Sequence, residues 1–129
     1  MLLVAVNILL NLAENIQIER KMKKRKISLF LIRLLERNNT HLLLITLEFL
    51  KKLSIFSENK NQMVEGNVFS KLPRILKCSN ENLIMSVLRL LVNLSFDKPA
   101  REMILNEKII PILVELLKKP KFRTIIIYL

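Results

Sequence analysis

Residues 92–95, Val-Asn-Leu-Ser, are one copy of a short block that occurs three times in this chain at a constant spacing. The other copies are Lys-Lys-Leu-Ser at residues 51–54 and Leu-Asn-Leu-Ala at residues 10–13. Their third residues are Leu12, Leu53 and Leu94, so the repeat interval, 53 − 12 = 94 − 53 = 41, is constant. The same interval links Leu9, Leu50 and Leu91; Leu31, Leu72 and Leu113; Leu3, Leu44, Met85 and Ile126; and Val6, Leu47, Leu88 and Leu129. Because apolar residues return to apolar residues, we expect one structural unit to be repeated along the chain.

An interval of roughly 40 residues is typical of helical repeats of the armadillo or HEAT type, in which no unit buries its apolar face without a neighbour. Three helices fit into each interval, and this favours the armadillo type. The predicted fold is all-α: a right-handed superhelical armadillo-repeat solenoid of about three repeats. We expect a partial repeat at residues 1–14, full repeats at 15–56 and 57–97, and a partial repeat at 98–129, so that the array is truncated at both ends.

Apolar residues occur at helical spacing throughout, and no strand pattern competes. The breaks at Asn38–Thr40 and Ser79–Asn80 contain side chains that cap the backbone N–H groups at the start of a helix. Pro73 and Pro111 lie near predicted helix starts, where a missing N–H is tolerated. The predicted helices include Ile16–Lys24, Ile27–Arg37, Thr40–Phe56, Val68–Lys77 and Ile109–Lys118.

The composition excludes several kinds of active site. The single glycine, Gly66, rules out phosphate-binding loops that need two or more glycines. The single cysteine, Cys78, and the single histidine, His41, form neither an internal disulfide nor a zinc site. No nucleophile, base and orienting acid recur together. We therefore expect no catalytic residue, no metal site, no cofactor and no enzymatic activity.

The opening run Met1–Ala13 is apolar except for Asn7 and Asn11. It has no basic leader and is shorter than the roughly 18 residues that a membrane span needs. Its register matches Leu42–Ser54 and Leu83–Ser95, so we interpret it as a buried repeat helix. A targeting segment is the alternative.

Two stretches are more specific than a generic repeat. Residues 49–65, FLKKLSIFSENKNQMVE, and residues 88–97, LRLLVNLSFD, closely resemble the kinesin-associated protein family, the non-motor subunits of heterotrimeric kinesin-2. LLNLAE at residues 9–14 and Lys21–Met22 resemble the preceding repeat of that family, and the resemblance extends from about Leu2 to Leu117. IIPILVELL at residues 109–117 is common to armadillo proteins generally.

This resemblance implies a non-catalytic adaptor in the cytoplasm, at the cytoskeleton and in the cilium. Its expected partners are the kinesin-2 motor subunits and cargo or intraflagellar transport proteins. A small-molecule substrate, a cofactor and a membrane span are not expected. The family's proteins are much longer than this chain, so this chain is expected to carry only part of their binding surface.

A row of polar residues is the candidate partner-binding groove. In armadillo solenoids the long third helix of each repeat lines the concave surface, and residues four apart share one face of a helix. Amides and charges in such a row can bind an extended peptide. The alternative is that they are only the solvated side of amphipathic helices. The candidates are Asn7, Asn11, Glu48, Lys52, Arg89 and Asn93.

A basic armadillo or HEAT module that binds nucleic acid or nuclear-transport cargo is the alternative function. Asn11 and Asn93 resemble the asparagines with which importin-type proteins hold basic peptides, but this chain has no tryptophan, and Lys52 stands at the middle position. A net charge of +11 repels a basic ligand. Nucleic acid is disfavoured because only 5% of residues are aromatic, too few for stacking platforms.

Six cations lie within residues 20–26 at a predicted corner between helices: Arg20, Lys21, Lys23, Lys24, Arg25 and Lys26. One interpretation is a patch for an acidic partner, such as a motor tail, tubulin, nucleic acid or anionic lipid. The other is a solvated corner whose charges complement the C-terminal end of a helix dipole.

Four phenylalanines at helical spacing are predicted to fill gaps between stacked repeats, since aromatic side chains are far more often core than ligand-binding residues. They are Phe49, Phe56, Phe69 and Phe96.

Overall fold

The computed structural model describes residues 2–12, 15, 20–21 and 26–127, and every element in these residues is a helix. The prediction of an all-α fold is therefore confirmed. The elements are α1 (Leu2–Leu12), α3 (Ile27–Leu34), α4 (Thr40–Leu53), α5 (Ser57–Glu65), the 3-10 helix η1 (Val68–Lys71), α6 (Leu72–Leu76), α7 (Glu81–Leu94), α8 (Lys98–Asn106), α9 (Ile109–Leu116) and α10 (Pro120–Ile126). The predicted helix Ile16–Lys24 lies outside the described residues except for Arg20 and Lys21.

The repeat interval of the sequence recurs in the helices. α4 and α7 have the same length and begin one repeat interval apart, and so do α5 and α8. α3, η1 and α9 begin at residues 27, 68 and 109. The interval in the sequence therefore corresponds to a spatial unit of consecutive helices.

Asparagine side chains begin the two long helices, as the sequence predicts. The Leu42 N–H donates to Asn39 Oδ1 over 3.1 Å. The N–H groups of Asn82 and Leu83 donate to Asn80 Oδ1 over 3.0 and 3.2 Å. These bonds satisfy backbone donors that have no partner within the helix.

A left-handed residue precedes each of α3, η1 and α9. Lys26, Asn67 and Lys108 have φ angles of 53°, 49° and 58°. Each is separated from the next by one repeat interval, so each unit turns at the same place with the same backbone conformation. None of the three is glycine, and a left-handed conformation costs an ordinary residue roughly 1–2 kcal/mol.

Four predicted helices differ in extent from the structure, and one of them, predicted as Ile109–Lys118, ends at Leu116 as α9. Residues 68–77 form η1 followed by α6 rather than one α-helix. α4 ends at Leu53; the Ser54 hydroxyl donates to the Lys51 carbonyl over 2.6 Å, and Phe56 directly precedes α5. α3 ends at Leu34, where the next N–H groups bond three residues back rather than four.

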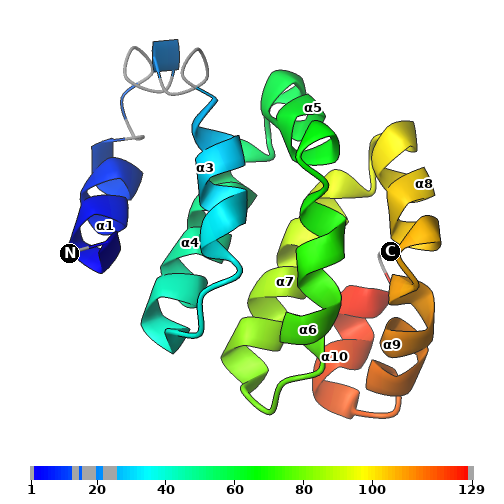
Figure 1. The fold of residues 1–129 in the computed structure, drawn as a ribbon. Coiled ribbons are helices and arrows are strands. Elements are labelled where there is room, and N and C mark those ends of the chain that lie inside the picture. The colour runs from blue at the N-terminus through cyan, green and yellow to red at the C-terminus, as the bar shows by residue number, and fades with distance from the viewer. Residues whose placement is uncertain (1, 13–14, 16–19, 22–25, 128–129) are drawn as a thin grey trace.

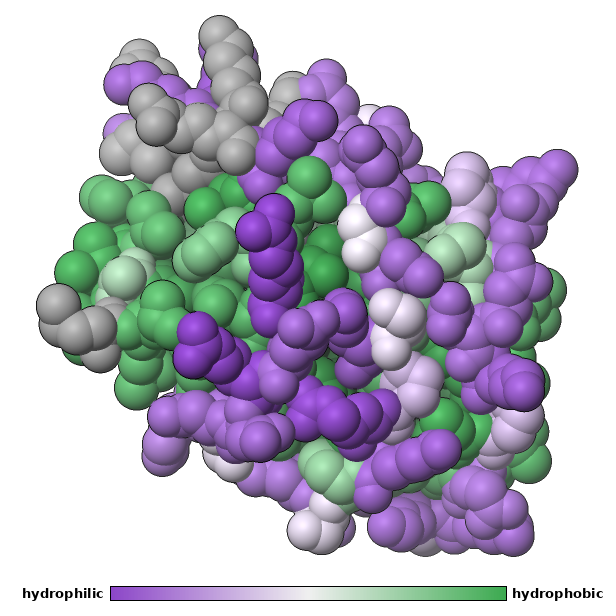
Figure 2. All heavy atoms as spheres, viewed as in Figure 1, coloured by the Kyte–Doolittle hydropathy of each residue, from purple (hydrophilic) through white to green (hydrophobic). Residues whose placement is uncertain are grey.

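The helices stack side by side in two layers (Figure 1). α1, α4, α7 and α10 follow one another in one layer, with contacts between each successive pair. α3, α6 and α9 form the other layer and pack against α4, α7 and α10 respectively. α5 lies between α3 and α8. Figure 2 shows that apolar residues gather at the end of this face where α1 lies, whereas polar residues cover most of the remainder.

The recurring leucines form the interior between the layers. Leu47, Leu50, Leu88 and Leu91 are fully buried, and Val6 of α1 is buried with them. The opening run thus forms a helix that packs against α4. No helix within the described part of the chain is long and apolar enough to cross a membrane.

Two of the four predicted core phenylalanines are exposed. Phe49 and Phe69 are fully buried, as predicted. The prediction is wrong for Phe56 and Phe96, which lie in the turns that lead into α5 and α8 and are exposed to solvent. Their helical spacing does not place them in the core because the helices end before them.

Candidate partner-binding surface

The six predicted groove residues lie on three neighbouring helices. Asn7 and Asn11 are on α1, Glu48 and Lys52 are on α4, and Arg89 and Asn93 are on α7, which packs against α4 as α4 packs against α1. Asn7, Asn11, Glu48 and Arg89 are exposed, whereas Lys52 and Asn93 are half-buried. These helices are neighbours in one layer of the fold, so each of three successive units contributes two of the six residues.

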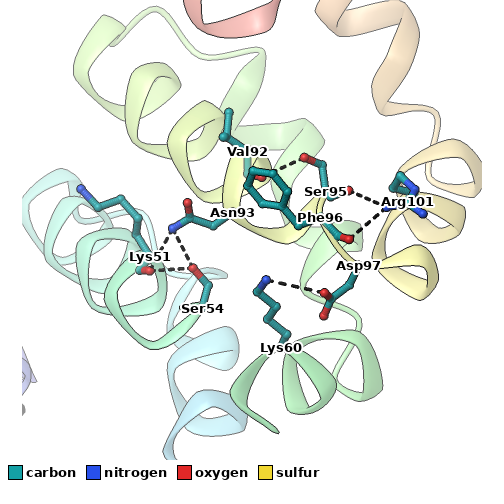
Figure 3. A network of polar contacts seen from close by, with 9 residues as sticks. All are labelled: Lys51, Ser54, Lys60, Val92, Asn93, Ser95, Phe96, Asp97 and Arg101. Carbon is teal, nitrogen blue, oxygen red and sulfur yellow. Dashed lines mark hydrogen bonds and ion pairs between the residues drawn. The ribbon is translucent and has the colours of Figure 1, made fainter. Parts of the chain in front are cut away.

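Asn93 of this row forms two hydrogen bonds with the end of α4 (Figure 3). Its Nδ2 donates to the Lys51 carbonyl over 3.2 Å and to Ser54 Oγ over 3.0 Å. Both acceptors are at the C-terminal end of α4, where carbonyl groups have no partner within the helix. The amide donors of Asn93 therefore connect α7 to α4, and the side chain presents only its Oδ1 atom, an acceptor, to a ligand.

A shallow hollow of about 270 Å³ adjoins Asn93. Arg89 and Asn93, both predicted, line it together with three residues that the sequence analysis missed: Lys51, Val92 and Ile125. Lys51 was missed because it is adjacent to the predicted position rather than at it. Ile125 comes from α10, and only the packing of α10 on α7 brings it to this surface.

The hollow is basic. Lys51 Nζ lies 3.3 Å from Glu48 Oε1, an ion pair within one turn of α4. Arg89 is exposed, and no hydrogen bond or ion pair of its side chain is found in the described part of the chain. Its guanidinium has five donors in a planar arrangement that suits carboxylates. The chemistry of this surface is thus recognition of acidic and acceptor groups beside two apolar side chains.

A second polar network fixes the turn between α7 and α8 (Figure 3). Arg101 Nη1 donates to the carbonyls of Ser95 and Phe96 over 3.0 and 3.1 Å. Lys60 Nζ lies 3.6 Å from Asp97 Oδ1 and 5.8 Å from the centroid of the Phe96 ring. The exposed Phe96 is therefore held beside a cation from α5, at the junction of two units.

A larger groove of about 760 Å³ separates α6 from α9. Its lining surface is mainly apolar and includes Leu76, Pro111 and Leu116, together with Glu115 and Lys77. The junction between α3 and α6 differs. There Arg74 Nη2 donates to the carbonyls of Leu35 and Arg37, and Arg74 Nη1 donates to Asn38 Oδ1 over 3.2 Å. Glu115 occupies the position one repeat interval after Arg74 and cannot donate in this way.

Two exposed carboxylates form ion pairs with the next unit. The Glu36 carboxylate accepts a hydrogen bond from Lys71, and this lowers the pKa of Glu36 below its ordinary value. Likewise Lys121 donates to Glu81 and lowers the pKa of that carboxyl group. Glu36 lies just after α3 and Glu81 begins α7, and each is paired with a lysine of the following unit.

The basic patch is described only in part. Arg20, Lys21 and Lys26 are exposed. Lys23, Lys24 and Arg25 lie outside the described residues.

The remaining chemistry-bearing residues are separate from one another. Cys78 is half-buried beyond α6, and its Sγ lies 3.7 Å from the Asn80 carbonyl oxygen. His41 is exposed in the first turn of α4. Within the described ranges, no three histidine, cysteine, aspartate or glutamate side chains are grouped as metal ligands.

Comparison with protein families gives a match that covers the whole chain. The family model described as kinesin-associated protein (KAP) matches residues 1–129. The match includes the stretches at residues 49–65 and 88–97 on which the resemblance was based, and also both ends of the stack of helices.

Proposed function

Since this chain belongs to the kinesin-associated protein family, we propose that it is a non-catalytic adaptor or scaffold subunit of the kinesin-2 complex. In this role it binds the motor chains and links them to cargo for microtubule-based and intraflagellar transport. The observation that carries the proposal is the family match over all 129 residues. The sites of action that follow are the cytoplasm, the cytoskeleton and the cilium.

The proposed architecture is an armadillo-type solenoid. The recurrence of α4 and α7, of α5 and α8, and of α3, η1 and α9 at one constant interval supports it. We divide the chain into units at residues 15–56 and 57–97, flanked by partial units at 1–14 and 98–129. In such an array each unit adds one helix to a continuous layer, so a long partner can contact several units at once.

The proposed contact for a motor chain is the hollow beside Arg89 and its continuation along α4 and α1. Arg89 and Lys51 supply positive charge, Val92 and Ile125 supply apolar surface, and Asn93 supplies an acceptor. Together with the net charge of +11, this favours an extended segment that carries acidic and apolar side chains.

Binding of the chain to the tail segments of kinesin-2 motor chains tests this proposal. We expect Arg89→Glu to weaken binding by about tenfold or more, because it places like charges together in the contact. The matched control is Arg33→Glu, an exposed arginine on α3 in the other layer, which should bind as the unchanged chain does. Equal loss in both variants would mean that only the overall charge matters.

The competing function, a basic module for nucleic acid or nuclear-transport cargo, is favoured by one observation, the charge of +11. It predicts affinity for nucleic acid that falls steeply with salt concentration. Strong salt-dependent binding of nucleic acid without binding of motor tails would overturn the adaptor proposal in its favour.

A further inference from the structure

The groove of about 760 Å³ between α6 and α9 lies in the layer that does not contain Arg89 and its hollow. It separates two consecutive units and is not a face at either end of the stack. Its volume is within the roughly 300–1,000 Å³ that is typical of binding sites, which are likewise lined mainly by apolar side chains. The apolar residues that line it are Pro73, Leu76, Pro111, Ile112 and Leu116.

The preceding junction of the same layer is bridged by a side chain. Arg74 of α6 donates to the carbonyls of Leu35 and Arg37 at the end of α3. Glu115 stands one repeat interval after Arg74 and lines the groove, but a carboxylate cannot donate to carbonyl groups in this way. The groove therefore follows from the side chains that stand at this junction.

The positive charges of the groove are the ones without a partner. Both carboxylate oxygens of Glu115 lie 3.2 Å from Lys118 Nζ, and Glu107 Oε1 accepts from Asn67 Nδ2 over 3.1 Å. The lysines that line the groove are exposed, and within the described ranges their Nζ atoms form neither ion pairs nor hydrogen bonds. They are Lys77, Lys108 and Lys119.

These lysines lie at both ends of the groove. α6 and α9 run in the same direction (Figure 1), so Lys77, just after α6, and Lys119, shortly after α9, lie at one end. Lys108 directly precedes α9 and lies at the other end. α9 has 8 residues and is therefore about 12 Å long, a length that an extended chain spans in about four residues.

We propose that this groove binds a segment of another protein in which about four apolar residues are flanked by carboxylates. The apolar side chains cover the apolar lining, and the carboxylates pair with the lysines at the two ends. A small acid has one carboxylate for one end, and small-molecule sites enclose most of their ligand, whereas this groove is open to solvent along one side. The proposal does not rest on the adaptor function.

Fluorescence anisotropy with labelled peptides and the whole chain tests the proposal. The probes carry two aspartates at each end of four positions that are filled by leucine, isoleucine or phenylalanine in every combination. One control set has lysine in place of aspartate, and the other has serine in place of the apolar residues. We expect the tightest probes to bind about tenfold or more tightly than the best peptide of either control set. Their affinity should fall as salt is added.

Charge reversal locates the contact. Lys77→Glu should weaken binding of the tightest probe by about tenfold, because it places like charges together. Lys98→Glu, at an exposed lysine on α8, makes the same change in net charge and should bind as the unchanged chain does. Arg89→Glu, in the other layer, should also bind normally. Circular dichroism verifies that each variant retains its helices.

Glu115→Arg separates occupation of the groove from general attraction. It makes the chain more basic, so general attraction would strengthen binding, whereas a guanidinium that reaches across the groove as Arg74 does at the preceding junction should weaken it about tenfold. Tighter binding by this variant would overturn the proposal, and so would probes no tighter than the controls or equal losses in Lys77→Glu and Lys98→Glu.

Two further results would overturn the proposal by assigning the site or its occupant differently. Loss of probe binding in Arg89→Glu alone would place the peptides in the hollow and leave the adaptor proposal intact. Displacement of the tightest probe by decanoate at a comparable concentration would indicate a small apolar acid as the occupant. Failure of motor tails to bind would contradict the adaptor proposal and leave this one untouched.

Discussion

Thr46 and Val87 occupy the same position of the repeat, and both are fully buried. Among the described residues the Thr46 hydroxyl has no hydrogen-bond partner, whereas valine of nearly equal shape needs none. A buried hydroxyl without a partner costs roughly 1–3 kcal/mol. We therefore expect Thr46→Val to raise the free energy of unfolding by about 1 kcal/mol, measured by urea denaturation.

The reverse substitution is the control. Val87→Thr places a hydroxyl in an environment that the structure fills with apolar side chains, and it should lower the free energy of unfolding by about 1–3 kcal/mol. A loss of stability in Thr46→Val would mean that the hydroxyl has a bonding role that this geometry does not contain.

Substitution of Asn93 should also change the stability of the fold. Asn93→Asp keeps the shape of the side chain but replaces two donors with an anion that faces the Lys51 carbonyl and Ser54 Oγ at the C-terminal end of α4. The substitution destabilises the fold because the two hydrogen bonds are lost and because the new negative charge lies at the negative end of the α4 helix dipole. We expect a loss of about 2 kcal/mol in the free energy of unfolding at neutral pH, measured by urea denaturation.

Asn82→Asp is the matched change at the other end of α7. Asn82 is exposed in the first helical turn, where a negative charge is favourable. This variant should be as stable as the unchanged chain or slightly more so. Equal losses in the two aspartate variants would contradict the assigned role of the Asn93 amide.

At this scale the sequence predicts some residues well and others not at all. Asn39 and Asn80 were predictable as caps because an asparagine just before an apolar periodic run satisfies backbone donors. The left-handed Lys26 and Lys108 were not, because nothing in a lysine favours a positive φ angle.

Among the elements, the junctions between units differ although the helices recur. At the junction of α3 and α6, Arg74 donates to two carbonyls at the end of α3. At the junction of α6 and α9, Glu115 stands at that position and a groove of about 760 Å³ is present. An open junction therefore coincides with the absence of the arginine.

Removing the arginine from the first junction and introducing one at the second should change the free energy of unfolding in opposite directions. Arg74→Met should lower the free energy of unfolding by about 1–2 kcal/mol, since it removes hydrogen bonds of a charged donor. Glu115→Arg should raise it by about 1 kcal/mol, because the Glu115–Lys118 pair that it removes is exposed and contributes little. Urea denaturation measures both changes, and hydrogen exchange at the end of α6 should slow only in the second variant.

Long helices were more predictable than short ones. The starts of α4 and α7 follow from their caps and apolar periodicity. The division of residues 68–76 into η1 and α6 was missed, because the apolar spacing of a 3-10 turn is hard to distinguish from an α-helical one over so short a segment. Phe56 and Phe96 were misplaced for a different reason, since the apolar pattern did not show that α4 and α7 end before them.

For the whole molecule, the sequence predicted which face of the long helices would be polar but not which residues meet there. Arg89 and Asn93 were predictable from their positions one helical turn apart. Ile125 lies beside them only because α10 packs on α7. The hydrogen bonds of the Asn93 amide to α4 likewise depend on the distance between two units. The repeat interval in the sequence predicts that successive units pack on each other, but it does not predict which side chains are in contact between them.

Ion pairs between units make the stability of the whole molecule depend on pH. Glu36 and Glu81 have pKa values lowered from 4.5, first by the hydrogen bonds and then by the charges of Lys71 and Lys121. A carboxyl group whose pKa is lower in the folded state stabilises the fold above its unfolded pKa, and this contribution is lost as the pH falls through the folded value. The contribution of these pairs to stability should therefore be present at neutral pH and should be lost as the pH falls below 4.5.

The double variant Glu36→Gln/Glu81→Gln isolates this effect. It should be less stable than the unchanged chain at neutral pH, and the difference should disappear in acid, where the native carboxylates are protonated as well. Added salt should reduce the difference at neutral pH, because both pairs are exposed and screened by ions. Thermal unfolding measured at a series of pH values tests this, with Glu102→Gln, an exposed glutamate on α8, as the matched control. A difference that persists unchanged in acid would show that the glutamines disturb packing, and that the ion pairs contribute nothing to holding successive units together.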